Sequence, residues 1–575
     1  MRQVSSGFRT VRFGAFELDS SNGELRKQGI RIKPQEQPLR VLEMLLRSQG
    51  ELVTREELRT ALWPTNTLVD FDHGLNRAMN KLREALGDSA ERPQFIETLA
   101  KRGYRFMQNP DARPGEIRSL LVLPLENLSQ DPEQGYFADG LTEALITSLA
   151  KVSALRVLSR TTAVFYKREQ RSLANIAREL GVDGVIEGSV LRSEGRVRIT
   201  VQLLHAPTDT HLWAESYERD LRNILSLQAE VTSTIAREIR VKVTPQEQRQ
   251  LARAPAVDPQ AFDAYLRGRC YVDKRTPDAT RKAIHSFEEA IRIDPHLAPA
   301  IAGLAICFNV LGWYSYAPPA DGCGRAKALA LRALELDPQL AEAHAALGWA
   351  VQYIDFDFVA AEREFRHAIE LDPHYPVARY RYAMALTYVG RFDESIEEGK
   401  RALNLEPFSA TPNAAICWGY WHARRYDALL AHAKWSVDLH PDVPHCRWAL
   451  SHGYEATGDF EAAIGEMRFA VEASQGAVLF QALLAEVFAV AGRPEDAEAL
   501  LRQLQARARQ GYVSPYSIGR ICAVLGRTAE ALQWLETAYE KRAAWTVMLN
   551  HDPRLDSLRN EPRFQALVRR MNFPS

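Results

Sequence analysis

Donor-rich side chains gather on one face of a helix that the sequence predicts to begin near Asp72. Large apolar residues recur at Leu75, Met79, Leu82 and Leu86, and at 3.6 residues per turn this spacing places them on one stripe. The opposite face of the helix carries His73, Arg77, Asn80, Lys81 and Glu84. Several of these side chains can donate hydrogen bonds to phosphates or purine edges, so this face is a candidate for contact with DNA.

A short hairpin is predicted directly after this helix. Residues 95–99 alternate in polarity towards a basic turn at residues 101–103, and residues 104–106 form the returning strand. The basic side chains of the hairpin are Lys101, Arg102 and Arg105. A basic helix beside a basic hairpin is the arrangement of a winged helix, whose expected partner is double-stranded DNA.

The alternative interpretation is that the charged helix face is simply solvated, which is the commoner role of such a face. The residues before the helix favour DNA binding instead. Thr54 and Glu57 have the spacing of a capping box, which opens a short helix that ends near Trp63 and Pro64. Helix, connector, basic helix and hairpin then follow in the order of a DNA-binding winged helix.

These residues resemble the winged helix-turn-helix domain of OmpR/PhoB-type bacterial response regulators. The motifs that carry the resemblance include Phe16-Glu17-Leu18-Asp19, Leu52-Val53-Thr54-Arg55, Ala85-Leu86-Gly87-Asp88 and Arg102-Gly103-Tyr104-Arg105-Phe106. The major-groove residues that the resemblance implies are Arg77, Asn80, Lys81 and Arg83. The minor-groove residues that it implies are Lys101, Arg102 and Arg105. It also implies a dimer on DNA, with head-to-tail half-sites about one helical turn apart.

The whole chain has 575 residues and a formal net charge of −1. This length exceeds one hydrophobic core and indicates several domains. The near-zero charge is compatible with DNA binding, because a local basic patch supplies the attraction to phosphates. The six cysteines are scattered without a C-x-x-C pair, so we expect no metal site, disulfide framework or cofactor. No signal peptide or membrane-length apolar stretch stands out, which predicts a cytoplasmic protein with no membrane partner.

Residues 1–107 form the predicted winged-helix domain, and residues 117–245 form a predicted α/β domain. Linkers are expected at residues 108–116 and 246–257. An apolar run at residues 117–125 indicates a buried strand, and the last three strands of this domain are expected to be antiparallel.

The middle domain resembles the TolB N-terminal-like domain, most clearly between Pro132 and Glu143. Here Asp139 is expected to cap a helix that starts at Gly140, with Gly135 in a turn. The chain matches neither a P-loop, nor a Rossmann glycine pattern, nor a nucleophile elbow, so we predict no catalytic residues and no enzyme.

Residues 258–549 are repetitive. Proline follows an acidic residue or His440 at Pro338, Pro373, Pro407 and Pro441, at intervals of 35, 34 and 34 residues. This period and the small residues within it resemble the tetratricopeptide repeat, with about eight units. Residues 550–575 are expected to cap the last helix pair. The concave face of such an array commonly holds a peptide or protein.

The aromatic residues that could line this face are more often packed between repeats. They are Trp349, Tyr353, Tyr380, Tyr382, Trp418, Trp421 and Trp448. We therefore assign no ligand site to them.

The predicted fold class is multidomain: a winged helix (α+β), then an α/β domain, then an all-α tetratricopeptide superhelix. The predicted function is sequence-specific DNA-binding transcription regulation, with an architecture that resembles activators of invasion genes in enteric bacteria. Because no receiver domain is recognised, the signal is expected to enter through residues 258–575 as a protein or peptide. The alternatives are a repeat scaffold whose winged helix docks RNA polymerase or another protein, and an enzyme with an unrecognised site in the middle domain.

Overall fold

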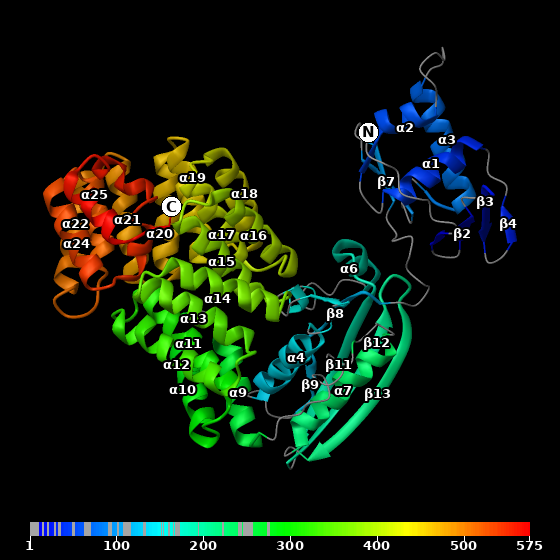
Figure 1. Cartoon of the computed structure of the whole chain (residues 1–575), viewed down its shortest axis with the longest axis horizontal. Helices are drawn as coiled ribbons and strands as arrows, with labels where there is room; N and C mark the ends of the chain where they lie inside the picture. Colours follow the sequence, from blue (N-terminus) through cyan, green and yellow to red (C-terminus); the bar gives the residue numbers. More distant parts are fainter. Residues whose placement is uncertain are drawn as a thin grey trace. The chain divides into compact units, whose positions relative to one another are not determined.

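The structure is a computed structural model of the chain (Figure 1). It describes residues 11–13, 16–19, 22–27, 30–32, 36–48, 52–62, 71–89, 95–99, 103–106, 117–129, 134–150, 152, 154–158, 162–164, 166, 173–193, 195–220, 223–239, 244, 257–272 and 276–574. The chain divides into two compact units, Met1–Ile117 and Arg118–Ser575. The first unit carries the predicted winged helix, and the second carries the middle domain together with the repeats.

The first unit begins with a small antiparallel sheet. Its strands, in the order β1-β2-β3-β4, are β1 (Val11–Phe13), β2 (Phe16–Asp19), β3 (Glu24–Lys27) and β4 (Ile30–Ile32). Three helices follow, namely α1 (Glu36–Arg47), α2 (Arg55–Leu62) and α3 (Phe71–Leu86). A second sheet has the order β5-β7-β6 and consists of β5 (Leu52–Thr54), β6 (Ile96–Leu99) and β7 (Gly103–Phe106).

The predicted hairpin and capping box are both present. Strands β6 and β7 pair antiparallel from Ile96 opposite Phe106 to Leu99 opposite Gly103. At the start of α2, the Thr54 amide donates to Glu57 Oε2 at 2.7 Å, and the Glu57 amide donates to Thr54 Oγ1 at 3.2 Å. The sequence did not reveal that the residues before Thr54 form a third strand, β5, which pairs with β7.

The middle domain is built on one mixed sheet. Its strands are β8 (Ser119–Val122), β9 (Glu126–Asn127), β10 (Arg156–Val157), β11 (Gly184–Ser193), β12 (Arg196–His205) and β13 (Thr210–Asp220). Their order is β10-β8-β11-β12-β13, and β9 also pairs with β11. Its helices are α4 (Gly135–Ala150), α6 (Leu173–Leu180) and α7 (Ile224–Glu238). Strands β11, β12 and β13 are antiparallel, as predicted, whereas β8 runs parallel to β10 and β11.

The expected turn and cap around Asp139 are wrong. Helix α4 already begins at Gly135, so Asp139 lies inside the helix and cannot be its N-cap. Gly140 has a packing role instead, because a Cβ built on it would lie 2.7 Å from the Cβ of Leu266 in α9 (Pro259–Val272). The absent side chain lets α4 approach α9 closely, and this contact holds the middle domain against the first repeat.

Within residues 257–272 and 276–574, the structure has eight helix pairs, in agreement with the predicted repeat count. The pairs are α9 with α10 (Pro277–Ile293), α11 (Ala298–Trp313) with α12 (Arg325–Leu336), α13 (Ala341–Ile354) with α14 (Phe358–Leu371), α15 (Pro376–Tyr388) with α16 (Phe392–Leu405), α17 (Ala410–His422) with α18 (Tyr426–Leu439), α19 (Pro444–Ala456) with α20 (Phe460–Ala473), α21 (Val478–Val490) with α22 (Pro494–Arg507), and α23 (Pro515–Val524) with α24 (Thr528–Glu540).

Glycines close several of the turns within these pairs. Gly390, Gly458, Gly492 and Gly526 have φ values of 82°, 81°, 73° and 74°, which a side chain would strain. The seven aromatic residues considered above are all buried in the folded chain.

Residues 550–575 were expected to cap only the final helix pair. The last part of the chain in fact contacts several repeats. It contains η4 (Ala544–Met548), η5 (Pro553–Leu558) and α25 (Pro562–Arg570). Trp545 of η4 packs against Trp313 of α11 and Trp418 of α17, which belong to earlier repeats, as well as beneath Arg520 of α23 in the last pair. The segment lies against the first helices of several repeats, which offer it aromatic side chains and buried charged side chains.

The contact between α4 and α9 gives a test of how the second unit is held together. We expect Gly140→Ala to lower the thermal unfolding temperature, because the added methyl group overpacks the contact with Leu266 at a cost of about 1–3 kcal/mol. Gly135→Ala is the matched control on the same helix, since a Cβ there meets nothing within 4 Å. Calorimetry of the full chain should show a loss for Gly140→Ala relative to Gly135→Ala, and equal unfolding temperatures would contradict the close approach.

Candidate nucleic-acid interface

Helix α3 buries one face and exposes the other. Leu75, Met79, Leu82 and Leu86 are all buried, as the spacing predicts. The exposed side chains on α3 are Asn76, Arg77, Asn80, Lys81 and Glu84. Among them, Asn76 was not counted with the candidate residues, although it lies four positions before Asn80 and therefore on the same stripe.

The predicted contact residues differ in whether their side chains are already paired with another side chain. Arg77 and Asn80 are exposed. Lys81 is exposed and forms an ion pair with Glu84 at 3.0 Å. Because both side chains are well exposed, this pair is weak and can open to a phosphate. Arg105 of β7 pairs across the hairpin with Glu97 at 2.9 Å.

Three further candidates lie partly or wholly outside the described residues. His73 belongs to α3, but its side chain is not described. Lys101 and Arg102 lie in the hairpin turn, outside the described residues. Their proposed contacts with DNA rest on the sequence alone.

The resemblance implies that Arg83 contacts the major groove, and the structure corrects this prediction. Its side chain is buried, with 7% of the residue exposed, and Nη2 donates to the Ile96 carbonyl at 3.0 Å and to Thr98 Oγ1 at 2.7 Å. A guanidinium held in this way cannot reach the major groove. Arg83 instead fastens the end of α3 to strand β6. Periodicity missed this because position 83 borders the apolar stripe, where a long side chain can turn either way.

A second polar cluster joins α2, α3 and the hairpin. Arg55 Nη1 donates to the Tyr104 hydroxyl at 3.0 Å, and Arg55 Nη2 donates to Asn76 Oδ1 at 3.2 Å. The Tyr104 hydroxyl also donates to Asn76 Oδ1 at 3.3 Å. The sequence signal for this cluster was weak, because the three residues are far apart along the chain.

The turn after α3 is set by Gly87 and Asp88. Gly87 has a φ of 66°, and the Asp88 amide donates back to the Arg83 carbonyl at 2.9 Å. Asp88 Oδ2 then accepts from the Phe95 and Ile96 amides at 3.3 and 2.9 Å. The start of β6 is therefore attached to the end of α3 by both Asp88 and Arg83, which fixes the hairpin beside the exposed helix face.

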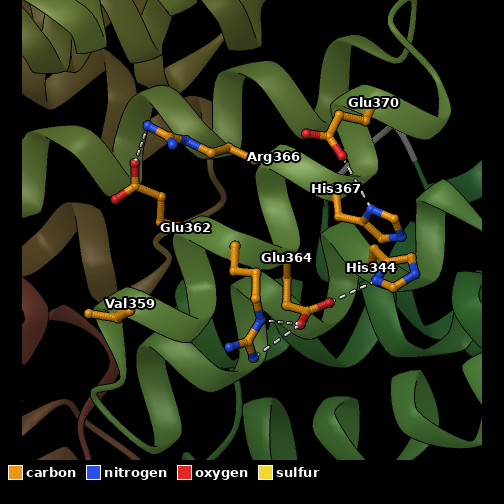
Figure 2. A pocket seen from close by; sticks show the side chains of 8 residues that line it. His344, Val359, Glu362, Glu364, Arg366, His367 and Glu370 are labelled. Carbon is orange, nitrogen blue, oxygen red and sulfur yellow. Dashed lines mark hydrogen bonds and ion pairs between the residues drawn. The ribbon is translucent and has the colours of Figure 1, made fainter.

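A separate hollow of about 610 Å³ lies on α13 and α14 (Figure 2). Its ionisable side chains pair with one another: His344 Nδ1 lies 2.7 Å from Glu364, and Arg366 lies 2.8 Å from Glu362. Burial lowers the pKa of His344, but hydrogen bonds to Glu364 and to the Pro338 carbonyl outweigh it and raise the pKa. The remaining lining residues are Val359, Arg363, His367 and Glu370, and Arg363 and His367 also lie within ion-pair distance of Glu364 and Glu370.

Among the described residues, no cluster of histidine, cysteine, aspartate and glutamate side chains is arranged to hold a metal ion. In the same residues, no helix combines the length and the apolar character needed to cross a membrane. The arginine and asparagine face of α3 with its adjoining hairpin therefore remains the strongest candidate site.

The buried position of Arg83 gives a test of how the hairpin is held. We expect Arg83→Met to speed hydrogen exchange at Ile96 and Thr98 about ten- to a hundred-fold, because losing hydrogen bonds from a charged donor costs about 1.5–3 kcal/mol. Lys81→Met is the control, since its side chain is exposed. Similar exchange in both variants would mean that Arg83 does not hold the hairpin.

Comparison with known protein families supports the assignment of each part. The family "Transcriptional regulatory protein, C terminal" matches residues 27–106. The "HilA/YgeH-like transcriptional regulator, second domain" matches residues 116–234, the domain that was expected to resemble TolB. Tetratricopeptide repeats match residues 478–503 and 519–537.

Two known proteins are similar to longer stretches of the chain. The transcriptional regulator HilA of Salmonella typhimurium is 23% identical over 420 residues, which cover 71% of this chain and 73% of HilA. A putative adenylate cyclase 3 of Rhizobium meliloti is 39% identical over 238 residues, covering 41% of this chain and 40% of that protein. This chain therefore spans less than half of the cyclase relative.

Among solved structures, the APC/C hetero-tetramer Cut9-Hcn1 is similar over 60% of this chain and 62% of the matched chain, at 14% identity and a TM-score of 0.38. A score at this level adds nothing to the argument. The chain thus combines a domain that matches the C-terminal domain of transcriptional regulatory proteins, a domain that matches the second domain of HilA/YgeH-like regulators, and tetratricopeptide repeats, and it is similar to the transcriptional regulator HilA over 71% of its length.

Proposed function

We propose that this regulator reads a specific DNA sequence with the exposed face of α3, and that a protein partner bound to its repeats controls the outcome. The observation that carries the first part is the exposure of two donor side chains, Arg77 and Asn80, on a helix whose opposite face is buried. An asparagine amide can pair with adenine in the major groove, and an arginine with guanine or phosphate.

The hairpin supports this proposal. Asp88 and Arg83 hold β6 beside the end of α3. The basic residues of the turn, Lys101 and Arg102, then follow the strand that these contacts anchor. A formal net charge of −1 for the whole chain means that attraction to DNA has to come from these local residues.

The second part rests on how the middle domain is joined to the repeats. Arg269 of α9 pairs with Glu143 of α4 at 3.1 Å and with Glu342 of α13 at 2.8 Å. Asp263 of α9 pairs with Arg192 of β11 at 2.7 Å. These partly buried contacts favour movement of the middle domain with the repeats, so a partner on the repeats can act on the DNA-binding unit through the expected linker at residues 108–116.

Two other functions remain to be tested. A scaffold whose winged helix docks a protein such as RNA polymerase would enrich no DNA sequence from random genomic fragments. The other alternative is that the protein is an enzyme. This alternative is suggested by the relative that is named as a putative adenylate cyclase. That match leaves more than half of both chains unmatched, so an adenylate cyclase assay of the full chain is the direct test.

The DNA-reading role predicts different effects for two substitutions. If Asn80 contacts a base edge, Asn80→Ala should cost about 1–3 kcal/mol on the selected site and relax the sequence preference. Arg102→Ala, which removes an expected phosphate contact, should weaken binding to all sequences alike and reduce the salt slope by about one unit. Titrations of selected and random DNA at several salt concentrations measure both effects.

The control for these titrations is Glu84→Gln. This substitution keeps the shape of an exposed side chain on α3, and Glu84 is not proposed to contact a base. It should leave the preference for the selected sequence unchanged. An equal loss of specific and non-specific binding in Asn80→Ala would refute the base-reading role of this residue.

The expected dimer on DNA can be tested through the spacing of half-sites. Inserting five base pairs between head-to-tail half-sites should abolish cooperative binding, because it turns one copy to the opposite side of the duplex. Inserting ten base pairs restores the rotational phase, at about 10–10.5 base pairs per turn, and serves as the control. Affinity that is unaffected by either insertion would indicate a monomeric binder.

A further inference from the structure

The last residues of the chain lie inside the curve formed by the repeats. We call residues 544–573 the tail. Trp545 of the tail stacks on Trp448 of α19, with ring centroids 5.6 Å apart and planes 16° apart, and lies 5.7 Å from Trp418 of α17. Its Nε1 donates to the carbonyl of Trp313 in α11 at 3.0 Å. One side chain can touch helices from the second, fifth and sixth repeats only if these helices curve around it.

Charged residues fix the next part of the tail. Arg554 pairs with Glu455 of α19 at 2.6 Å and approaches Glu486 of α21 at 3.5 Å. Asp552 pairs with Arg520 of α23 at 3.2 Å. Each of these side chains is at most 6% exposed. The Tyr516 hydroxyl of α23 also donates to Asp552 at 2.9 Å.

The tail also reaches elements outside the first helices. Asp556 pairs with Arg424, in the turn between α17 and α18, at 2.7 Å. At the far end, Phe573 stacks on Phe358 of α14 with ring centroids 4.8 Å apart. The tail thus contacts repeats from the second to the eighth, and its tryptophan and its buried charged residues contact the first helices of these repeats. Repeat arrays of this kind use their concave face for ligands.

The contacts have the composition of a protein–peptide interface. A tryptophan fills an aromatic pocket at the centre, which is the usual character of an interface hot spot. Buried ion pairs contribute little net stability compared with apolar packing of the same volume, but they discriminate strongly against a wrong register. A segment that served only to fill the core would not need Asp552 and Arg554 at fixed positions opposite three helices.

We propose that the inner face of the repeats is a peptide-binding groove and that the tail is its intramolecular ligand, which an external protein segment must displace in order to bind. A competing segment would carry an aromatic side chain for the Trp545 pocket, followed by an acidic and a basic residue for the sites of Asp552 and Arg554. This inference extends the proposed function, in which a protein partner bound to the repeats controls the regulator. Its regulatory part rests on that proposed function. The groove and its occupant can be tested without DNA.

The test uses the full chain and a fluorescent synthetic peptide with the sequence of residues 544–573. Trp545→Ala combined with Arg554→Gln weakens the attached tail but leaves every groove residue intact. Anisotropy should show saturable binding of the peptide to this double variant, at least ten-fold tighter than to the unaltered chain. A peptide that carries the same two substitutions should not bind.

Arg563→Gln is the matched control, because it removes an ion pair with Glu536 at 2.8 Å in which Arg563 is exposed, and it lies in the same tail. It should bind the peptide no better than the unaltered chain does. Equal binding to all three chains would overturn the proposal, because the peptide would then occupy another surface.

A second form of the protein covers the case in which the double variant does not fold. A protease site inserted after Arg542, in the turn before the tail, is cut once the full chain has folded. The labelled peptide should then exchange with the cut tail, as seen by co-elution in gel filtration. A cut tail that never exchanges would make the tail a permanent part of the core and overturn the proposal. DNA binding, measured in the same preparations, separates this outcome from a failure of the proposed function.

Discussion

Burial of one stripe of α3 is the constraint on which the DNA-binding surface depends. Leu75, Met79, Leu82 and Leu86 are withdrawn from water, and each large apolar side chain gains about 1.5–3 kcal/mol by this. If α3 rotated about its axis so that Asn80 pointed in another direction, some of these apolar side chains would become exposed to solvent. The direction in which the donors point is therefore determined by the core beneath them.

The polar contacts around α3 refine this arrangement without creating it. Arg83 and Asp88 attach the hairpin to the end of the helix, and Arg55 bonds to Asn76 and Tyr104 from the start of α2. All of these groups act on elements that the apolar stripe has already brought together. Their effect is to fix the hairpin relative to the exposed face, which a DNA duplex has to contact at the same time.

The second unit depends on close approach between helices. Phe287 of α10 is fully buried, and a Cβ on Gly268 of α9 or on Gly303 of α11 would lie 2.6 Å from its ring. Gly140 of α4 plays the same part against Leu266. Small residues on one helix and a large side chain on the next thus join neighbouring repeats, and the same device attaches the middle domain to the first of them.

Burial and charge compete within the contacts of the tail. Burial raises the pKa of Glu486 to about 7 despite the nearby Arg520 and Arg554. For Glu455, burial acts in the same direction, but Arg554 and His452 outweigh it and lower the pKa to about 2. Glu486 lies 2.9 Å from Arg520, but the nearby carboxylates Asp552 and Glu455 add to the effect of burial, whereas Glu455 is hydrogen-bonded by both Arg554 and His452.

Local patterns in the sequence were sufficient for the elements and for the outward face of α3. The apolar spacing predicted which face of α3 is buried, the pair Thr54 and Glu57 predicted the start of α2, and the proline intervals predicted the helix pairs. Each of these patterns spans a few residues or recurs at a nearly constant interval, so it can be recognised in the sequence. The fold class and the exposed positions of Arg77, Asn80 and Lys81 followed from them.

Only the tertiary structure decided the roles of residues whose partners are distant in sequence. Arg83 could have faced solvent or the hairpin, and the carbonyl of Ile96 with the hydroxyl of Thr98 turned it inward. Gly140 was expected only to begin a helix, and the position of Leu266 gives it its packing role. Trp545 lies 232 residues from Trp313, whose carbonyl it binds, and no periodicity connects them. The curvature of the whole array brings such residues together, and curvature is the sum of many small packing angles that no single repeat reveals.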